Sequence, residues 1–103
     1  MFLLIYITHP DEATAHSISN HLLEHRLIAC ANIYPMKSAY WWQGKVANEN
    51  EWVSIVKTQP EHWGVVCQQV EAIHPYEVPC ITRMEAHANA AYEAWIISET
   101  DRG

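Results

Sequence analysis

The segment after residue 73 brings three chemically useful side chains together. His74, Tyr76 and Glu77 supply an imidazole, a phenol and a carboxylate, and Pro75 and Pro79 stiffen the turn that carries them. Because a proline pushes the preceding residue out of the helical region, we expect an extended backbone at His74. Such a turn could hold a metal ion or a polar ligand. The alternative is a rigid corner between a helix and a strand, whose polar groups only cap the helix and the turn.

A second pair of imidazoles is formed by His21 and His25, which are four residues apart with Glu24 beside them. Side chains at this spacing lie on the same face of a helix, so the pair could chelate a divalent ion. The alternative is an ordinary solvated helix face.

The cysteines predict neither a disulfide framework nor a cysteine-based zinc site. Cys30, Cys67 and Cys80 are odd in number and contain no C-x-x-C pair. None has a base next to it in the sequence that would make it a nucleophile. We therefore expect a reduced, cytoplasmic protein.

Composition excludes several classes of partner. The 103 residues contain 6 Lys and Arg against 12 Asp and Glu, a net charge of −6, which disfavours nucleic acids and anionic membranes. No run approaches the roughly 20 apolar residues of a membrane span. Residues 2–7 form a short apolar run that is typical of a buried strand. Since 50% of the residues are hydrophobic, the chain can bury a core, and we expect a single domain over residues 1–103.

A faint internal repeat organises the chain. The β-rich run 2–7 leads into Thr8-His9-Pro10-Asp11, and the run 52–57 leads into Thr58-Gln59-Pro60-Glu61. Both signals are typical of a helix start: the threonine is expected to cap free amides, the proline suits the first turn, and the acid complements the helix dipole.

The segments after these signals have helical periodicity, and each then returns to an extended run, at 27–42 and at 78–84. The apolar stripes consist of Ala15, Ile18 and Leu22 in the first segment and of Trp63, Val66, Val70 and Ile73 in the second. The order β-α-β thus occurs twice, which predicts an α+β, ferredoxin-like split βαβ fold (βαββαβ). A helical pattern from Asn89 predicts a further helix at the C-terminus.

Residues 29–56 are β-rich, with Pro35 inside the first half and a turn at Gln43-Gly44. Two long strands joined by a tight turn would extend beyond a core of this size as a hairpin arm. The arm carries four aromatic side chains, Tyr40, Trp41, Trp42 and Trp52. An exposed aromatic arm favours symmetric self-association. The alternative is that Pro35 ends a strand and the arm folds back on its own sheet.

The chain resembles the CutA divalent-cation tolerance family in five motifs that occur in the family's order and cover nearly its whole length. These are Ala29-Cys30-Ala31-Asn32-Ile33-x-Pro35, Tyr40-x-Trp42-x-Gly44-Lys45, Lys57-Thr58, His74-Pro75-Tyr76-Glu77-x-Pro79 and Tyr92-x-x-Trp95. The resemblance implies a ferredoxin-like homotrimer in which long hairpin strands pair across subunits. It also implies a non-catalytic role in the tolerance of divalent metals, copper especially.

The resemblance further implies where a metal would bind. The suggested copper site of bacterial relatives uses a cysteine at the end of the first strand and two histidines before Pro-Tyr. Those positions are Ile7, Ile73 and His74 here, so only His74 is carried over as a ligand for Cu²⁺ or another divalent cation. Glu77 or Cys80 at a subunit cleft could add donors.

His87 stands where a glycine commonly precedes the last helix of the family. It is either an extra donor or an exposed loop residue.

Two functions remain open. The first is a trimeric, metal-responsive protein, which should lose metal binding on His74→Ala. The second is a PII-like small-ligand sensor that uses Lys45, Tyr76 and tryptophan-lined clefts between subunits and is stabilised by a metabolite without metal. Catalysis is not expected, because the motifs supply no nucleophile–base pair.

Overall fold

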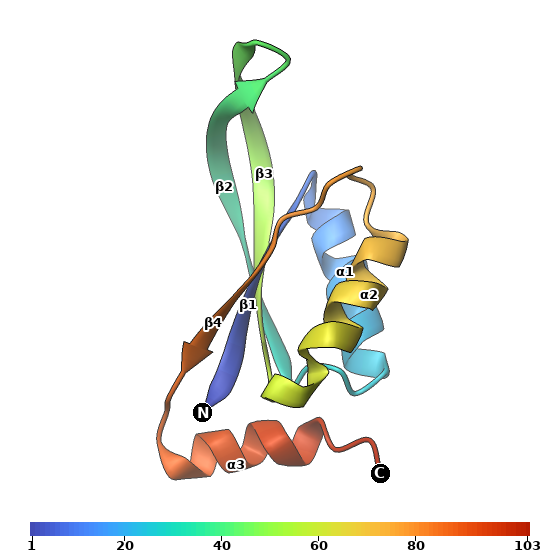
Figure 1. Ribbon diagram of the computed structural model, residues 1–103, viewed down its shortest axis with the longest axis vertical. Helices are drawn as coiled ribbons and strands as arrows, with labels where there is room; N and C mark the ends of the chain where they lie inside the picture. The colour runs from blue at the N-terminus through green and yellow to red at the C-terminus, as the bar shows by residue number, and fades with distance from the viewer.

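The chain forms a four-stranded antiparallel sheet with the strand order β2-β3-β1-β4, and two helices pack against one of its faces (Figure 1). The computed structural model describes residues 1–103. In chain order the elements are β1 (Phe2–His9), α1 (Glu12–Glu24), β2 (Cys30–Trp42), β3 (Lys45–Thr58), a 3₁₀ turn (Pro60–His62), α2 (Trp63–Ile73), β4 (Ile81–Ala86) and α3 (Ala90–Glu99). This architecture confirms the predicted α+β, ferredoxin-like fold. None of the helices has both the length and the apolar character that a membrane span needs.

The core lies between the sheet and the pair α1 and α2. Alternate side chains of β1 point toward the helices, as the two-residue period of a strand requires. The fully buried apolar side chains of this cluster include Leu3, Ile5 and Ile7 of β1, Ile18 and Leu22 of α1, and Val66 and Val70 of α2. The two predicted helical stripes thus supply the core, although Ile73 at the end of the second stripe is exposed.

The helix start signals work differently from the prediction. The N-cap of α1 is Asp11, whose carboxylate accepts a hydrogen bond from the Thr14 amide at 2.7 Å, while Thr8 remains in β1. The backbone hydrogen bond from Thr14 lowers the pKa of Asp11. Thr58 is likewise the last residue of β3, and its hydroxyl donates to the Leu27 carbonyl at 2.6 Å. Because a proline follows two residues after each threonine and keeps the chain extended before it, neither threonine is an N-cap. The second proline does stand in the first turn as predicted, since Pro60 opens the 3₁₀ turn that leads into α2, with Glu61 after it.

The strands β2 and β3 form one continuous hairpin that extends beyond the rest of the molecule (Figure 1). The molecule therefore measures 45 × 25 × 21 Å. Gln43 and Gly44 form the turn with φ values of +50° and +78°, as a tight hairpin turn requires. Pro35 stays in register opposite Trp52, so the alternative in which the strand ends at Pro35 is wrong. Its missing amide is tolerated because β2 is an edge strand.

The strand β4 begins later than predicted. The extended run was expected from residue 78, but Val78 and Pro79 belong to the connection between α2 and β4, and pairing starts at Ile81. Pro79 has no amide to donate to the neighbouring strand, which explains the later start.

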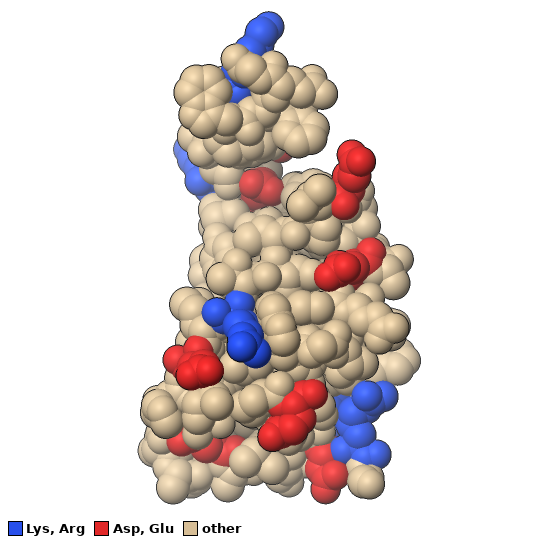
Figure 2. Space-filling view, in the orientation of Figure 1, with Lys and Arg blue, Asp and Glu red and all other residues tan.

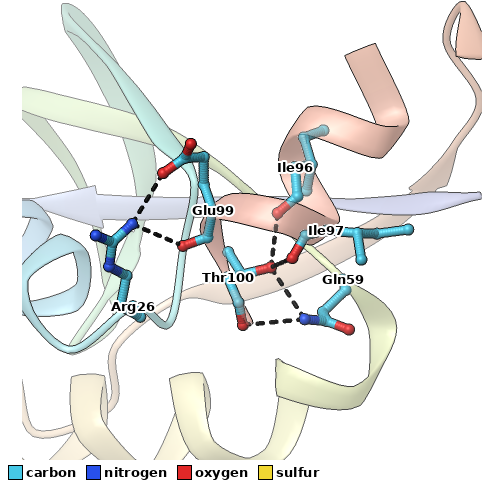
Figure 3. Close-up of polar contacts among 6 residues, drawn as sticks. All are labelled: Arg26, Gln59, Ile96, Ile97, Glu99 and Thr100. Atoms are coloured by element: carbon cyan, nitrogen blue, oxygen red, sulfur yellow. Dashed lines mark hydrogen bonds and ion pairs between the residues drawn. The ribbon is translucent and has the colours of Figure 1, made fainter. Parts of the chain in front are cut away.

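The C-terminal helix begins where the sequence predicts, with Asn89 at its N-cap. Its C-terminal end is held by polar contacts with two loops (Figure 3). The Arg26 guanidinium binds the Glu99 carboxylate at 2.8 Å, and the Gln59 amide donates to the carbonyl and the hydroxyl oxygen of buried Thr100 at 3.0 Å each. These contacts fix α3 across one end of the sheet.

The second face of the sheet, which we call the open face, is apolar but covered by neither α1 nor α2. Directly paired residues share a face, so the register places Leu4, Tyr6 and Ile55 here together with Met84. Tyr34 joins them through its pairing with Val53, and both Tyr34 and Met84 are exposed. An apolar sheet face of this kind is normally covered by something else.

Replacement of the fully buried Leu22 by alanine should lower the free energy of unfolding by about 2–5 kcal/mol, because it removes side-chain contacts and leaves a cavity. Urea unfolding followed by circular dichroism measures the change. Ser17→Ala on the exposed side of the same helix is the control and should change the value by less than about 0.5 kcal/mol. Equal effects of the two changes would contradict this description of the core.

Candidate functional site

His74 joins the end of α2 to the end of β1. Its amide donates to the Val70 carbonyl at 2.8 Å, and its backbone is extended (φ −73°, ψ 137°), as predicted from the proline that follows. The ring Nε2 lies 2.7 Å from the Thr8 carbonyl oxygen, and Nδ1 lies 3.1 Å from the Tyr76 amide nitrogen. A carbonyl only accepts and an amide only donates, so Nε2 carries the proton and Nδ1 is the acceptor.

The positions suggested for copper do not fit a three-ligand site in this chain. Ile7 is fully buried in the core and Ile73 is the last residue of α2. Both have hydrocarbon side chains, so neither offers a donor atom. A metal at His74 would have to displace the Tyr76 amide from Nδ1. No group of three or more His, Cys, Asp or Glu side chains is placed to hold a metal ion. The role of His74 as a ligand stays a prediction.

His9 lies directly behind His74 and was not singled out by the sequence. The two rings stack with centroids 5.4 Å apart, and Nε2 of His9 lies 2.8 Å from the Ser54 hydroxyl oxygen. Its Nδ1 is buried without a partner. Burial, and secondly the neighbouring His74, lower the pKa of His9 to about 4, against the opposing effect of Asp11 and Glu51. The imidazole is therefore held neutral at the base of the turn.

A groove of about 580 Å³ opens between the outer half of the hairpin and the connection that follows α2. Its walls combine three aromatic rings with three carboxylates, namely Tyr40, Trp42, Tyr76, Glu49, Glu51 and Glu77. The Tyr76 hydroxyl donates to Glu51 at 2.6 Å, and only 7% of Glu51 is exposed. Burial, and then this hydrogen bond, raise the pKa of Tyr76. The groove is thus acidic and aromatic, with Cys80 also on its wall.

The remaining motif residues meet beneath α3. The Lys57 ammonium donates to the Tyr92 hydroxyl at 3.0 Å, and the Cys30 thiol lies 3.7 Å from the same oxygen. The hydrogen bond to Tyr92 raises the pKa of Lys57. Three motifs that are far apart in the sequence therefore converge at one point where α3 contacts the sheet.

The other predicted residues lie apart from the groove. His21 and His25 lie at the end of α1, as predicted. Lys45 is the first residue of β3 and pairs with Trp42 at the far end of the hairpin. His87 is exposed between β4 and α3.

The fold and the groove define a small ferredoxin-like domain with an elongated, aromatic hairpin. The family model described as CutA1 divalent ion tolerance protein matches residues 3–99. The chain belongs to this CutA1 family.

Relatives match along the whole chain. The divalent-cation tolerance protein CutA of Pyrococcus horikoshii is 37% identical over 101 residues, which cover 97% of this chain and 99% of the relative. The solved structure of a protein described as the periplasmic divalent cation tolerance protein CutA of Archaeoglobus fulgidus superposes with a TM-score of 0.96 at 38% identity, covering 98% of this chain and 100% of the other. The structure of the divalent ion tolerance protein CutA1 of Ehrlichia chaffeensis gives a TM-score of 0.94 at 36% identity, covering 97% and 95%.

Stability should fall on acidification because of His9. Its folded pKa of about 4 lies below the ordinary 6.5, so the unfolded state binds more protons between these values. The contribution is complete above about pH 6.5 and is lost as the pH falls toward 4, by at most about 1.4 kcal/mol per pH unit.

Urea unfolding of the wild type and of His9→Gln at neutral and at mildly acidic pH measures this contribution. His9→Gln should show a weaker loss of stability on acidification, whereas His16→Gln, at an exposed position of α1, should keep the wild-type dependence. A His9 variant with the unchanged wild-type dependence would contradict the assignment.

Tyr76→Phe should lower the free energy of unfolding by about 1–3 kcal/mol, because the buried Glu51 carboxylate loses its hydroxyl donor. Tyr34→Phe is the matched control, since the hydroxyl of the exposed Tyr34 makes no hydrogen bond within the chain, and should be nearly neutral. Thermal or urea unfolding of both variants makes the comparison, and equal stabilities would refute the role of this hydrogen bond.

Proposed function

We propose that the chain acts in divalent-cation tolerance as a non-catalytic, cytoplasmic homotrimer that binds a divalent cation, such as Cu²⁺, at a cleft between subunits. The observation that carries the proposal is the apolar surface that a single chain leaves uncovered. The trimer is the assembly that the resemblance to the family implies. The three free cysteines favour a reducing compartment.

The hairpin supports assembly most strongly. Trp41 is 75% exposed and Trp42 is 60% exposed near its end. In Figure 2 the upper part of the molecule, where the hairpin lies, is mostly uncharged, with basic side chains at the tip. Tryptophans exposed in this way are costly in water and are typical of the buried centre of an interface.

The sheet itself also favours a closed assembly. Its two outer strands, β2 and β4, have one unpaired edge each. The long edge of β2 could pair with a strand of a neighbouring subunit, and a cyclic trimer would protect every such edge while covering the open face.

The side-chain arrangement supports a non-catalytic role. His74 uses both ring nitrogens in hydrogen bonds to the backbone, and His9 is buried. The hydrogen-bond partner of the Cys80 thiol is the Thr82 hydroxyl, at 3.6 Å, and not an imidazole. No imidazole is therefore positioned to activate a nucleophile in the groove.

The groove is the candidate place for a divalent cation in this trimer. Glu49, Glu51 and Glu77 give it a negative potential, and Cys80 adds a soft donor on the same wall. His74 lies behind this wall and would become a ligand if Nδ1 released the Tyr76 amide.

Calorimetric titration of the wild type and of His74→Ala with Cu²⁺ tests the metal part of the proposal. Saturable binding that is lost in His74→Ala supports it. Binding of equal strength in both proteins would exclude His74 as a ligand.

A small-ligand sensor is the second candidate, and the size of the groove favours it. A volume of about 580 Å³ with three aromatic rings suits an organic molecule. The carboxylates would select a cationic ligand. Such a ligand should raise the melting temperature in the presence of a metal chelator.

Sedimentation equilibrium at micromolar concentration should give three times the mass of one chain. Replacement of both Trp41 and Trp42 by serine should weaken the assembly at least tenfold, since two exposed aromatic side chains leave the interface. His16→Ser, on the exposed face of α1, is the control and should leave it unchanged. A wild-type monomer at this concentration would overturn the proposal.

A further inference from the structure

His21 and His25 form a compact pair at the C-terminal end of α1. His21 lies in the last turn and His25 is the C-cap residue of the helix. Their ring centroids are 4.4 Å apart with 39° between the planes. His25 is exposed and His21 is half-buried, so solvent reaches the pair.

The hydrogen bonds of the two rings determine which nitrogens are free. Nε2 of His21 lies 2.8 Å from the Oε1 atom of Gln69 on α2, and Nδ1 of His25 lies 2.8 Å from the His21 carbonyl oxygen. Both partners are oxygens that only accept, so each of these nitrogens carries a proton. Nδ1 of His21 and Nε2 of His25 therefore keep their lone pairs, and neither makes a hydrogen bond within the protein.

This is the protonation pattern of histidines that bind metals. A ligating imidazole commonly donates its other N–H group to an oxygen, which fixes the tautomer and the orientation of the ring. Both rings already meet this condition, one through a side-chain amide and one through the helix backbone.

The electrostatic surroundings also favour a cation. The last carbonyls of a helix carry partial negative charge, and Glu24 precedes His25 in the sequence. The nearest cationic side chain in the sequence, Arg26, is bound to the Glu99 carboxylate at 2.8 Å. Its charge is thus compensated within the protein.

We propose that His21 and His25 form a second, separate metal site, which binds one divalent transition-metal ion through Nδ1 of His21 and Nε2 of His25. Water completes the coordination. Two imidazoles favour Cu²⁺ most strongly, followed by Ni²⁺ and Zn²⁺. The site needs neither the groove nor His74, and a single chain contains it completely.

Titration with Cu²⁺ near neutral pH, followed by calorimetry and by electron paramagnetic resonance, tests the site. The wild type should bind Cu²⁺ with a spectrum that shows two nitrogen ligands. His21→Gln and His25→Gln should each weaken this binding at least tenfold, and the double variant should abolish the two-nitrogen signal. His16→Gln, an exposed histidine on the same helix, is the matched control and should bind like the wild type.

Gln69→Leu tests whether Gln69 positions the His21 ring, because Gln69 itself would not touch the metal ion. It should weaken Cu²⁺ binding about tenfold, as the loss of a partner that orients a ligand does, with an unchanged circular dichroism spectrum. Selective paramagnetic broadening of the His21 and His25 ring resonances in the wild type gives a readout that needs no variant.

The outcomes separate this site from the groove. An unchanged two-nitrogen signal in the His21→Gln, His25→Gln double variant, or no selective broadening of these two rings, would overturn the inference. Loss of all binding in His74→Ala alone would also overturn it, while supporting a metal at the groove. Two independent binding events, each removed by its own variant, would support both sites.

Discussion

The helices α1 and α2 cover only one face of the sheet, α3 contacts only one end of the other face, and most other features of this protein follow from that arrangement. The central strand β1 pairs on both sides, so its alternate side chains meet two different environments. Leu3, Ile5 and Ile7 are buried beneath α1 and α2, whereas Leu4 and Tyr6 remain on the open face. Tyr92 of α3 contacts Phe2 and Lys57 at one end of that face, but the chain of about 100 residues has no further layer that covers the rest of it or the end of the hairpin. Association with other copies is the physical solution that the proposed trimer supplies.

A single imidazole connects this scaffold to the groove. His74 donates through Nε2 to the Thr8 carbonyl near the end of β1 and accepts the Tyr76 amide at Nδ1, so it sets the path of the turn. That path brings the Tyr76 hydroxyl onto Glu51 of the hairpin and thereby closes the groove wall. The same two hydrogen bonds occupy both ring nitrogens, so a metal ion at His74 would have to displace one of the partners. The pair on α1 has the opposite property, because its hydrogen bonds leave one lone pair free on each ring.

The sequence predicted the features that depend on local pattern. The helical stripes, the hairpin turn at Gln43-Gly44 and the helix after Asn89 all follow from short-range periodicity and turn chemistry. The threonine caps were wrong because proline geometry shifts the helix start toward Asp11. For the site, the sequence predicted the residues of the turn after α2, but it did not identify His9 and Glu51. His9 bonds to Ser54, 45 residues away, and Glu51 is buried by Tyr76, 25 residues away, so no local signal could identify either.

Hydrogen–deuterium exchange of the outward-facing amides of β2 tests the central claim most directly. These amides have no partner within one chain, because β2 is the edge of the sheet. If copies of the chain cover this edge and the hairpin, the outward-facing amides among residues 36–42 should exchange slowly at high protein concentration and rapidly after dilution below the assembly range, whereas the amides that face β3 are protected within one chain. Rapid exchange at every concentration would show that the hairpin stays uncovered and would contradict the account.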